Sequence, residues 1–103
     1  MFAIAYDFDT EKLKRHYHND SHTNAYGDIK KFMADYGFTT VQGSVLYGNN
    51  TVTMVTAMMA VSQLSQKFPW INSSVKDIRI LQILENDDLK PFIASVTPDP
   101  SLV

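Results

Sequence analysis

The stretch Met1-Phe-Ala-Ile-Ala-Tyr-Asp-Phe-Asp9 decides the fold, because it predicts a β-strand whose two faces differ. Large apolar side chains alternate along it with small or acidic ones: Phe2, Ile4, Tyr6 and Phe8 against Ala3, Ala5, Asp7 and Asp9. A period of two places these sets on opposite faces of a strand. One face therefore builds a core. The other is flat and carries Asp7, which either ends the strand in solvent or lies where a second subunit approaches.

The composition is that of one folded domain. The chain has 103 residues, of which 45% are hydrophobic and 19% are charged, unlike a disordered sequence. It contains no cysteine, which excludes a disulfide framework, a zinc-thiolate site and a thiol nucleophile. We expect a single domain over residues 1–96, followed by a flexible tail over residues 97–103.

The charge balance limits the partners. A formal charge of -2 argues against a protein that grips long duplex DNA over a broad basic surface. The longest apolar runs fall short of the ~20 residues that span a bilayer, and the first residues do not resemble a signal peptide. We therefore expect a cytoplasmic protein without membrane contact. Any contact with nucleic acid should be local, at basic clusters: Lys12, Lys14 and Arg15; Lys30 and Lys31; Lys76 and Arg79.

The next elements follow from periodicity and turn residues. Residues 11–22 are polar without a repeating pattern, which predicts a loop, either irregular throughout or with one turn of helix, ending in the N-cap candidates Asn19, Asp20 and Ser21. A helix of about fifteen residues should follow and end at Gly37. Two β-prone runs, 38–41 and 44–47, flank Gln42-Gly43 and predict a hairpin. A second helix should then run from a cap at Asn50 or Thr51 to about Lys67.

The last third of the chain predicts one more strand. Residues 72–74 suit a turn, and residues 75–84 suit a long strand with Asp77, Arg79 and Leu81 on one face. Residues 88–96 fit either a short helix with Pro91 in its first turn or an edge strand, since proline is tolerated in both.

The order strand, helix, strand, strand, helix, strand predicts an α+β fold of the ferredoxin-like βαββαβ type. In it, two helices cover one face of an antiparallel sheet. The first and last strands are then antiparallel neighbours, which brings Asp7 beside Asp77. Both acids and Arg79 share the uncovered face with Ala3, Ala5 and Leu81. That face is too apolar at its centre to be left to water, so we expect a homodimer formed across it.

Several segments resemble the virulence-associated protein D family. They are the opening FAIAYDF, the pair YGF and VQGSVLY, the helix AMMAVSQL, and Trp70 with SVKDIR at 74–79. The resemblance runs from Met1 to about Ile93. More distantly, the chain resembles the second small CRISPR-associated protein, a ferredoxin-like dimer. The resemblance implies a homodimeric bacterial endoribonuclease, in some members the toxin half of a toxin-antitoxin pair.

The resemblance also implies site residues. Asp7 matches a strand-end aspartate at the dimer interface, Ser44 matches the serine of a Gly-Ser-Val motif, and Asp77 matches the aspartate of a Val-Lys-Asp-Ile-Arg motif. We take these three as candidate catalytic residues. The departures from the distant family are Thr40 in place of a basic residue and Leu46 in place of a phenylalanine. These departures argue against metal-dependent DNA cleavage.

Two Asp7 carboxylates brought together by a two-fold axis, with Asp77 nearby, would offer hard oxygen ligands to Mg²⁺ or Mn²⁺. No organic cofactor is expected. If the carboxylates meet without metal, one can act as a general base on the RNA 2′-hydroxyl. We expect RNA contacts from these residues: Tyr6, Lys12, Lys14, Arg15, Lys76 and Arg79.

Other interpretations stay open at this point. Asp7 and Asp77 can instead form an ion-pair network with Arg79 across the dimer, and Ser44 can be an ordinary turn residue. The segment with His16, His18 and His22 has spacing for a zinc site or a general acid, but a solvated loop explains it more simply. The chain can also be a non-catalytic dimer that binds a partner such as an antitoxin by strand addition. A small-ligand regulatory domain is a third class, which a missing glycine-rich phosphate loop disfavours.

Overall fold

The structure is a computed structural model that describes residues 1–18 and 21–102. Its elements follow one another in this order: β1 (Phe2–Phe8), α1 (Thr10–His16), α2 (Asn24–Ala34), β2 (Phe38–Gln42), β3 (Val45–Gly48), α3 (Met54–Lys67), α4 (Pro69–Ser74), β4 (Val75–Gln82), α5 (Lys90–Ser95) and a 3₁₀ turn, η1 (Pro100–Leu102).

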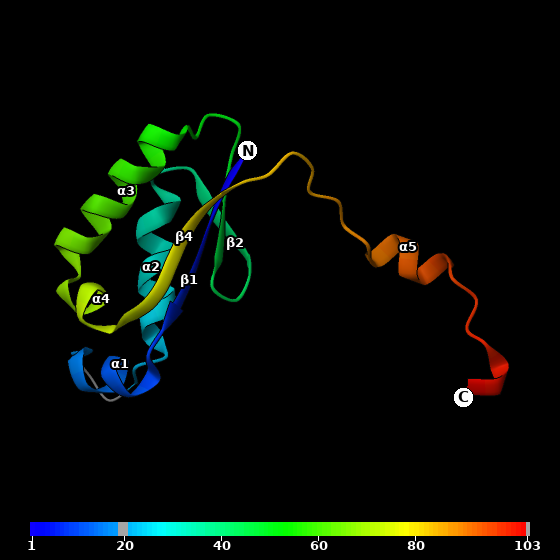
Figure 1. Cartoon of the computed structure of the whole chain (residues 1–103), viewed down its shortest axis with the longest axis horizontal. Coiled ribbons are helices and arrows are strands. Elements are labelled where there is room, and N and C mark those ends of the chain that lie inside the picture. The colour runs from blue at the N-terminus through cyan, green and yellow to red at the C-terminus, as the bar shows by residue number, and fades with distance from the viewer. Residues whose placement is uncertain (19–20, 103) are drawn as a thin grey trace.

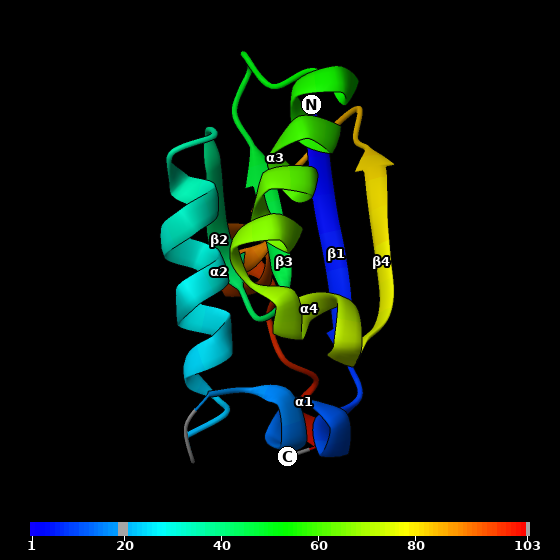
Figure 2. The same ribbon diagram turned by 90° about the vertical axis from the view of Figure 1, so that its left-hand side faces the viewer.

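The four strands form one antiparallel sheet in the order β2-β3-β1-β4. Helices α2 and α3 lie against the same face of this sheet, and among the described residues no helix lies against the opposite face (Figure 1; Figure 2). This is the predicted ferredoxin-like α+β architecture, with α1, α4 and α5 as additions. Because β1 is central and β4 lies at an edge, the end of β1 meets the start of an edge strand.

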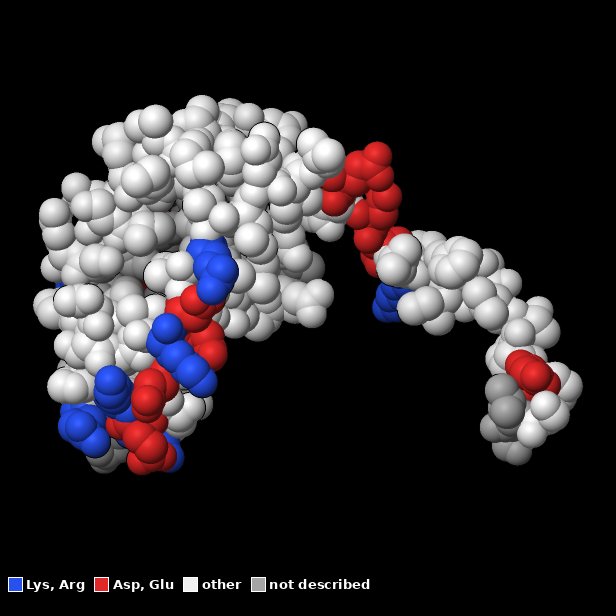
Figure 3. All heavy atoms as spheres, in the orientation of Figure 1, with Lys and Arg blue, Asp and Glu red and all other residues white. Residues whose placement is uncertain are grey.

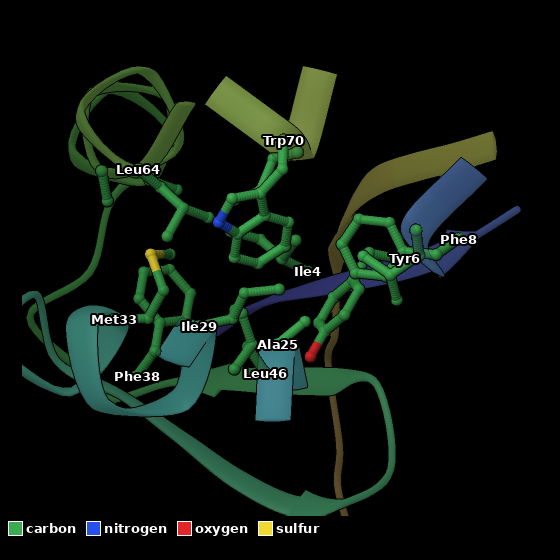
Figure 4. Close-up of a cluster of buried hydrophobic side chains, with 14 of the residues drawn as sticks. Ile4, Tyr6, Phe8, Ala25, Ile29, Met33, Phe38, Leu46, Leu64 and Trp70 are labelled. Atoms are coloured by element: carbon green, nitrogen blue, oxygen red, sulfur yellow. The ribbon is translucent and has the colours of Figure 1, made fainter. Parts of the chain in front are cut away.

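The core lies between the sheet and its two covering helices, and β1 supplies its floor. Ile4, Tyr6 and Phe8 are buried, as the period of two predicts. Figure 4 shows them facing apolar side chains of α2, of the neighbouring strands and of the α3–α4 corner, namely Ala25, Ile29, Met33, Phe38, Leu46, Leu64 and Trp70. This packing fixes which way β1 faces, and so it fixes the side on which Asp7 lies.

Two predicted irregular segments are helices instead. Residues 10–16, expected as part of a loop, form α1, which Asp9 caps and which buries Leu13. Residues 72–74, expected as a turn, are the end of α4, a helix that starts at Pro69 and buries Trp70. Both helices are short, and they pack against each other. Their stability comes from this packing, which a local pattern does not reveal.

Helix caps differ in detail from the predictions. Thr23, not Ser21, precedes α2, while Asn19 and Asp20 lie outside the described residues. Helix α3 begins after Thr53, whose side chain forms a capping box with Thr56, and not at Asn50 or Thr51. Gly37 has a φ of 87°, which supports its predicted role in the turn that follows α2. The hairpin turn at Gly43 is present too, with a φ of 52°.

The chain beyond β4 leaves the compact part of the fold. Of the two alternatives for residues 88–96, the structure has the helix, with Pro91 in its first turn. Residues 84–101 are all exposed, and Figure 1 shows α5 standing apart from the sheet. The flexible tail over 97–103 stays a prediction, and Val103 lies outside the described residues. Within the described ranges, we find no helix with both the length and the apolar character that crossing a bilayer requires.

Candidate functional site

The candidate site is centred on two aspartates that face each other across neighbouring strands. Asp7 in β1 and Asp77 in β4 are direct partners in the antiparallel ladder. Directly opposite residues have Cβ atoms about 5 Å apart and point to the same side of the sheet. Because Tyr6 and Phe8 point into the core, Asp7 and Asp77 share the uncovered face. Both are exposed, so their carboxylates are accessible from solvent.

The ladder is interrupted directly beside this pair. Asp7 is opposite Asp77, but Phe8 is opposite Val75, so β4 has one extra residue, Lys76, at this point. Such a β-bulge bends the strand and redirects the side chain of the extra residue, and bulges are frequent next to active sites. The bulge therefore places an ammonium group, exposed to solvent, beside the two acids.

Arg79 is bonded to one of the two acids. Its Nε donates to Oδ1 and Oδ2 of Asp77 at 3.1 and 2.9 Å. The hydrogen bond and the charge of Asp77 raise the pKa of the Arg79 guanidinium further above its ordinary value. The side chain of Arg79 remains 71% exposed, and its terminal nitrogens are outside this ion pair. Arg79 can therefore bind an anion while Asp77 holds it in place.

The end of β1 continues directly into a basic helix. Asp9 accepts a hydrogen bond from the backbone N–H of Lys12 at 3.0 Å and caps α1. This backbone hydrogen bond, together with the positive charges of Lys12 and Lys76, lowers the pKa of Asp9 below its ordinary value. The cap, two residues beyond Asp7, fixes the start of α1 at Thr10, and Lys14 and Arg15 are exposed in the last turn of this helix.

Charged side chains gather in one strip that follows β4 down to α1, with acids and bases alternating (Figure 3). We call it the charged strip and define it by the charged residues of these elements: Lys76, Asp77 and Arg79 in β4, Glu11, Lys12, Lys14 and Arg15 in α1, and Asp7 and Asp9 at the end of β1. One base is partly neutralised, since Lys14 Nζ lies 3.6 Å from Glu11. The strip places cations on β4, which holds Asp77, and on α1, which follows the strand of Asp7.

Two predicted site residues lie elsewhere. Tyr6, expected to contact RNA, is 6% exposed and stacks on Tyr26 with ring centroids 6.0 Å apart. Burial raises the pKa of Tyr6 to about 12, and its ring is part of the core. Ser44 accepts a hydrogen bond from the backbone N–H of Tyr6 through its own carbonyl. It therefore lies opposite Tyr6, and strand alternation assigns its side chain to the helix-covered face, away from Asp7.

The histidine segment does not form a cluster in the part that the structure describes. His16 ends α1, and His18 is exposed with its ring 4.3 Å from that of Tyr17. Across residues 1–18 and 21–102, no three His, Cys, Asp or Glu side chains lie close enough together to hold a metal ion. Within one chain, the Asp7–Asp77 pair thus offers two carboxylates and not a complete set of ligands.

Sequence reasoning missed Asp9 as an organising residue. The signal was present, because an acidic residue followed by Thr10-Glu11 and a single apolar Leu13 is typical of a capped helix start. Without that helix, the cations of α1 would have no fixed position relative to Asp7.

The fold and site define a small ferredoxin-like protein with an acidic pair and a charged strip at one end of its sheet. No family model matches the chain. It is 42% identical over 94 residues to endoribonuclease VapD 2 of Riemerella anatipestifer, covering 91% of this chain and all of that protein. It is 42% identical over 96 residues to an endoribonuclease VapD homolog of Helicobacter pylori, covering 93% of this chain and 99% of that one. Endoribonuclease VapD of Haemophilus influenzae is 39% identical over 93 residues, 90% of this chain and 98% of its own. The chain belongs to the endoribonuclease VapD family.

Proposed function

We propose that this protein is an endoribonuclease that cleaves phosphodiester bonds at the Asp7–Asp77 pair. The observation that supports the proposal most strongly is their direct pairing beside a bulge, with Arg79 and Lys76 next to them. Full-length relatives named as endoribonucleases support the same reaction. A purely structural sheet gains nothing from two like charges placed opposite each other, since such pairs are destabilising.

The active form in this proposal is a homodimer joined across the uncovered sheet face. The centre of that face is apolar and is made by Ala3, Ala5, Val45, Tyr47 and Leu81. Leu81 is 43% exposed, Ala5, Val45 and Tyr47 are half-buried, and Ala3 is buried by its neighbours, so the face offers a partner a modest apolar surface centred on Leu81. A two-fold axis through this face would bring the Asp7 side chains of both copies towards one another and double the number of carboxylates at the site.

The donor set fits a hard divalent cation once two copies contribute. Carboxylate oxygens are the ligands that Mg²⁺ and Mn²⁺ prefer, and Asp7 from each copy with Asp77 would hold the ion. A bound cation would supply charge stabilisation and an activated water at neutral pH. Arg79 and Lys76 would position the scissile phosphate, and Lys12, Lys14 and Arg15 would hold the adjacent backbone.

A metal-free route uses the same residues. In this route the exposed carboxylate of Asp7 would accept the proton of the RNA 2′-hydroxyl, while Asp77 stays bonded to Arg79. Only two of the described acids meet here within one chain, and this route needs no further carboxylate from the second copy. Arg79 would then stabilise the charge that develops on phosphorus.

We also propose that the nuclease is the toxin of a toxin-antitoxin pair, as the family resemblance suggests. An antitoxin would silence it by covering the charged strip and so blocking the phosphate contacts. Co-expression of the wild type with neighbouring reading frames, scored by growth, tests this. We expect cells that express the wild-type protein alone to stop growing, and co-expression of one neighbouring reading frame to restore growth. Unimpaired growth of cells that express the wild-type protein alone would count against a role as a toxin.

The deciding experiment is cleavage of a defined RNA by wild type and Asp7→Asn in parallel, with mass analysis of the new ends. We expect cleavage by wild type alone. A 5′-phosphate product indicates activated water, whereas a 2′,3′-cyclic phosphate indicates attack by the ribose. Asp35→Asn is the matched control, because Asp35 is an exposed acid at the end of α2, outside the charged strip. Equal cleavage by all three proteins would remove the site from the proposal.

A further inference from the structure

Helix α5 and its cap residues, Leu89 and Val96, expose an apolar stripe. Leu89, Phe92, Ile93 and Val96 are 62%, 64%, 68% and 54% exposed. Their spacing of i, i+3, i+4 and i+7 puts them on one side of a helix. An isolated helix of six residues is unstable in water, so α5 needs a surface to pack against.

A second apolar surface lies on the helix-covered side of the sheet, between α3 and the edge strand β4. We call it the α3–β4 groove. Its walls are Ala57, Met58 and Val61 of α3 and Ile78, Arg79 and Ile80 of β4. Met58 is 63% exposed and Ile78 is 38% exposed. Methionine side chains adapt to partners of different shape, and an apolar helix lying in a groove is a common mode of recognition.

The chain leads α5 away from its own groove. Met1 and Ile83 exchange two backbone hydrogen bonds, of 2.8 and 3.1 Å, which hold the chain at the end of β4. From there it leaves on the uncovered side of the sheet, opposite to α3, in both Figure 1 and Figure 2. This is the side on which the proposed function places the second copy.

We propose that α5 of one copy packs its apolar stripe into the α3–β4 groove of a second copy, so that the two chains exchange C-terminal arms. The inference rests on the homodimer of the proposed function. Seven residues, 83–89, separate β4 from α5 and reach about 23 Å when extended. Two facing sheets lie about 10 Å apart, and a helix layer adds about 10 Å. The arm is therefore long enough to pass the partner's sheet edge and enter its groove.

Charge supports the same occupant. The linker before α5 carries exposed acids at Glu85, Asp87 and Asp88, which Figure 3 shows as one acidic segment. On the uncovered face that the arm would cross before it reaches the groove, edge strand β4 carries the exposed side chain of Arg79, with Lys76 on the same strand. Opposite charges would orient the arm as it crosses β4, with α5 following into the apolar part of the groove.

The test uses cross-linking, because the chain has no cysteine and each engineered thiol is unique. Purified Phe92→Cys and Met58→Cys proteins are mixed and treated with a short bis-maleimide. We expect a covalent dimer from the mixture, and from the double variant as well. One matched control is Ala94→Cys, about 200° round α5 from residue 92, and the other is Gln63→Cys, about 140° round α3 from residue 58. Both should cross-link at least fivefold less.

Each outcome decides the question. A link within one chain of the double variant would show that the arm folds back on its own groove and would overturn the inference. Absence of any link above the controls, or linkage only to a different protein in cell extract, would overturn it too. As a second readout, Phe92→Glu should raise the dimer dissociation constant at least about tenfold in sedimentation. A Phe92→Cys and Met58→Cys mixture that is dimeric and cleaves RNA but does not cross-link would refute the arm exchange alone, whereas a cross-linked dimer that leaves RNA intact would refute the nuclease alone.

Discussion

Asp7 and Asp77 are direct partners in the ladder between β1 and β4, on the sheet face that the helices leave uncovered. Like charges in this arrangement repel each other, and Arg79 reduces that cost because its Nε donates to both oxygens of Asp77. The pairing leaves Asp7 as the acid without an ion pair to Arg79. This asymmetry suggests different roles, with Asp7 in the chemistry and Asp77 in positioning Arg79.

Asp7→Asn should abolish cleavage without harming the fold. We expect the cleavage rate to fall at least about 100-fold, since acid-base groups contribute factors of that size. Stability should stay equal or rise by about 0.2–1 kcal/mol, because one of two opposed charges is removed. RNA cleavage rates and urea unfolding measure the two effects. A variant that loses activity together with its folded structure would contradict the separation, and Asp35→Asn should leave both quantities unchanged.

Arg79→Lys tests the phosphate contact. A lysine keeps the charge but cannot present a planar fork to Asp77 and a phosphate at once. We expect KM for RNA to rise about tenfold with a smaller change in kcat, whereas the dependence of KM on salt between 50 and 200 mM should stay as in wild type, because the charge is kept. Steady-state kinetics at the two salt concentrations measure this. An unchanged KM would mean that Arg79 only pairs with Asp77.

Asp9→Ala should loosen α1. The carboxylate accepts from Lys12 N–H, and this bond lowers the pKa of Asp9. A group with a lowered pKa stabilises the fold above its ordinary pKa, and that contribution disappears as pH falls through the folded value. We therefore expect the melting temperature to drop by about 4–8 °C at pH 7 and by much less at pH 2. Asp9→Asn keeps a capping oxygen and should melt near wild type. An equal drop at both pH values would contradict this role of the carboxylate.

The sequence allowed the position of Asp7 relative to Asp77 to be predicted, because alternation in β1 and the βαββαβ order together fix the register of two neighbouring strands. Tyr6 illustrates a conflict between two arguments. Alternation predicts its ring in the core, which the structure confirms, whereas the contact with RNA suggested by the resemblance stays a prediction that this burial does not favour. Helix α1 was missed because Leu13 is its one buried residue, so no apolar stripe is visible in the sequence. Its stability depends on α4, a contact between residues far apart in the chain.

Tyr17→Phe should change how stability depends on alkaline pH. Burial, and then the hydrogen bond to Asp28 and the charge of that residue, raise the pKa of Tyr17 to about 12. A raised folded pKa adds stability that is complete below the ordinary value of about 10 and is lost as pH rises towards 12. Wild type should therefore lose stability between pH 10 and 12. The Tyr17→Phe variant should lose less stability over that window. At pH 7 it should be less stable than wild type by about 1–2 kcal/mol, because the bond to Asp28 is missing.

The stability of the variant still depends on pH, because Tyr6 also has a pKa near 12. Urea unfolding at pH 7, 9.5 and 11.5 measures both effects, and parallel curves for the two proteins would show that the Tyr17 hydroxyl ionises as freely in the folded chain as in the unfolded one.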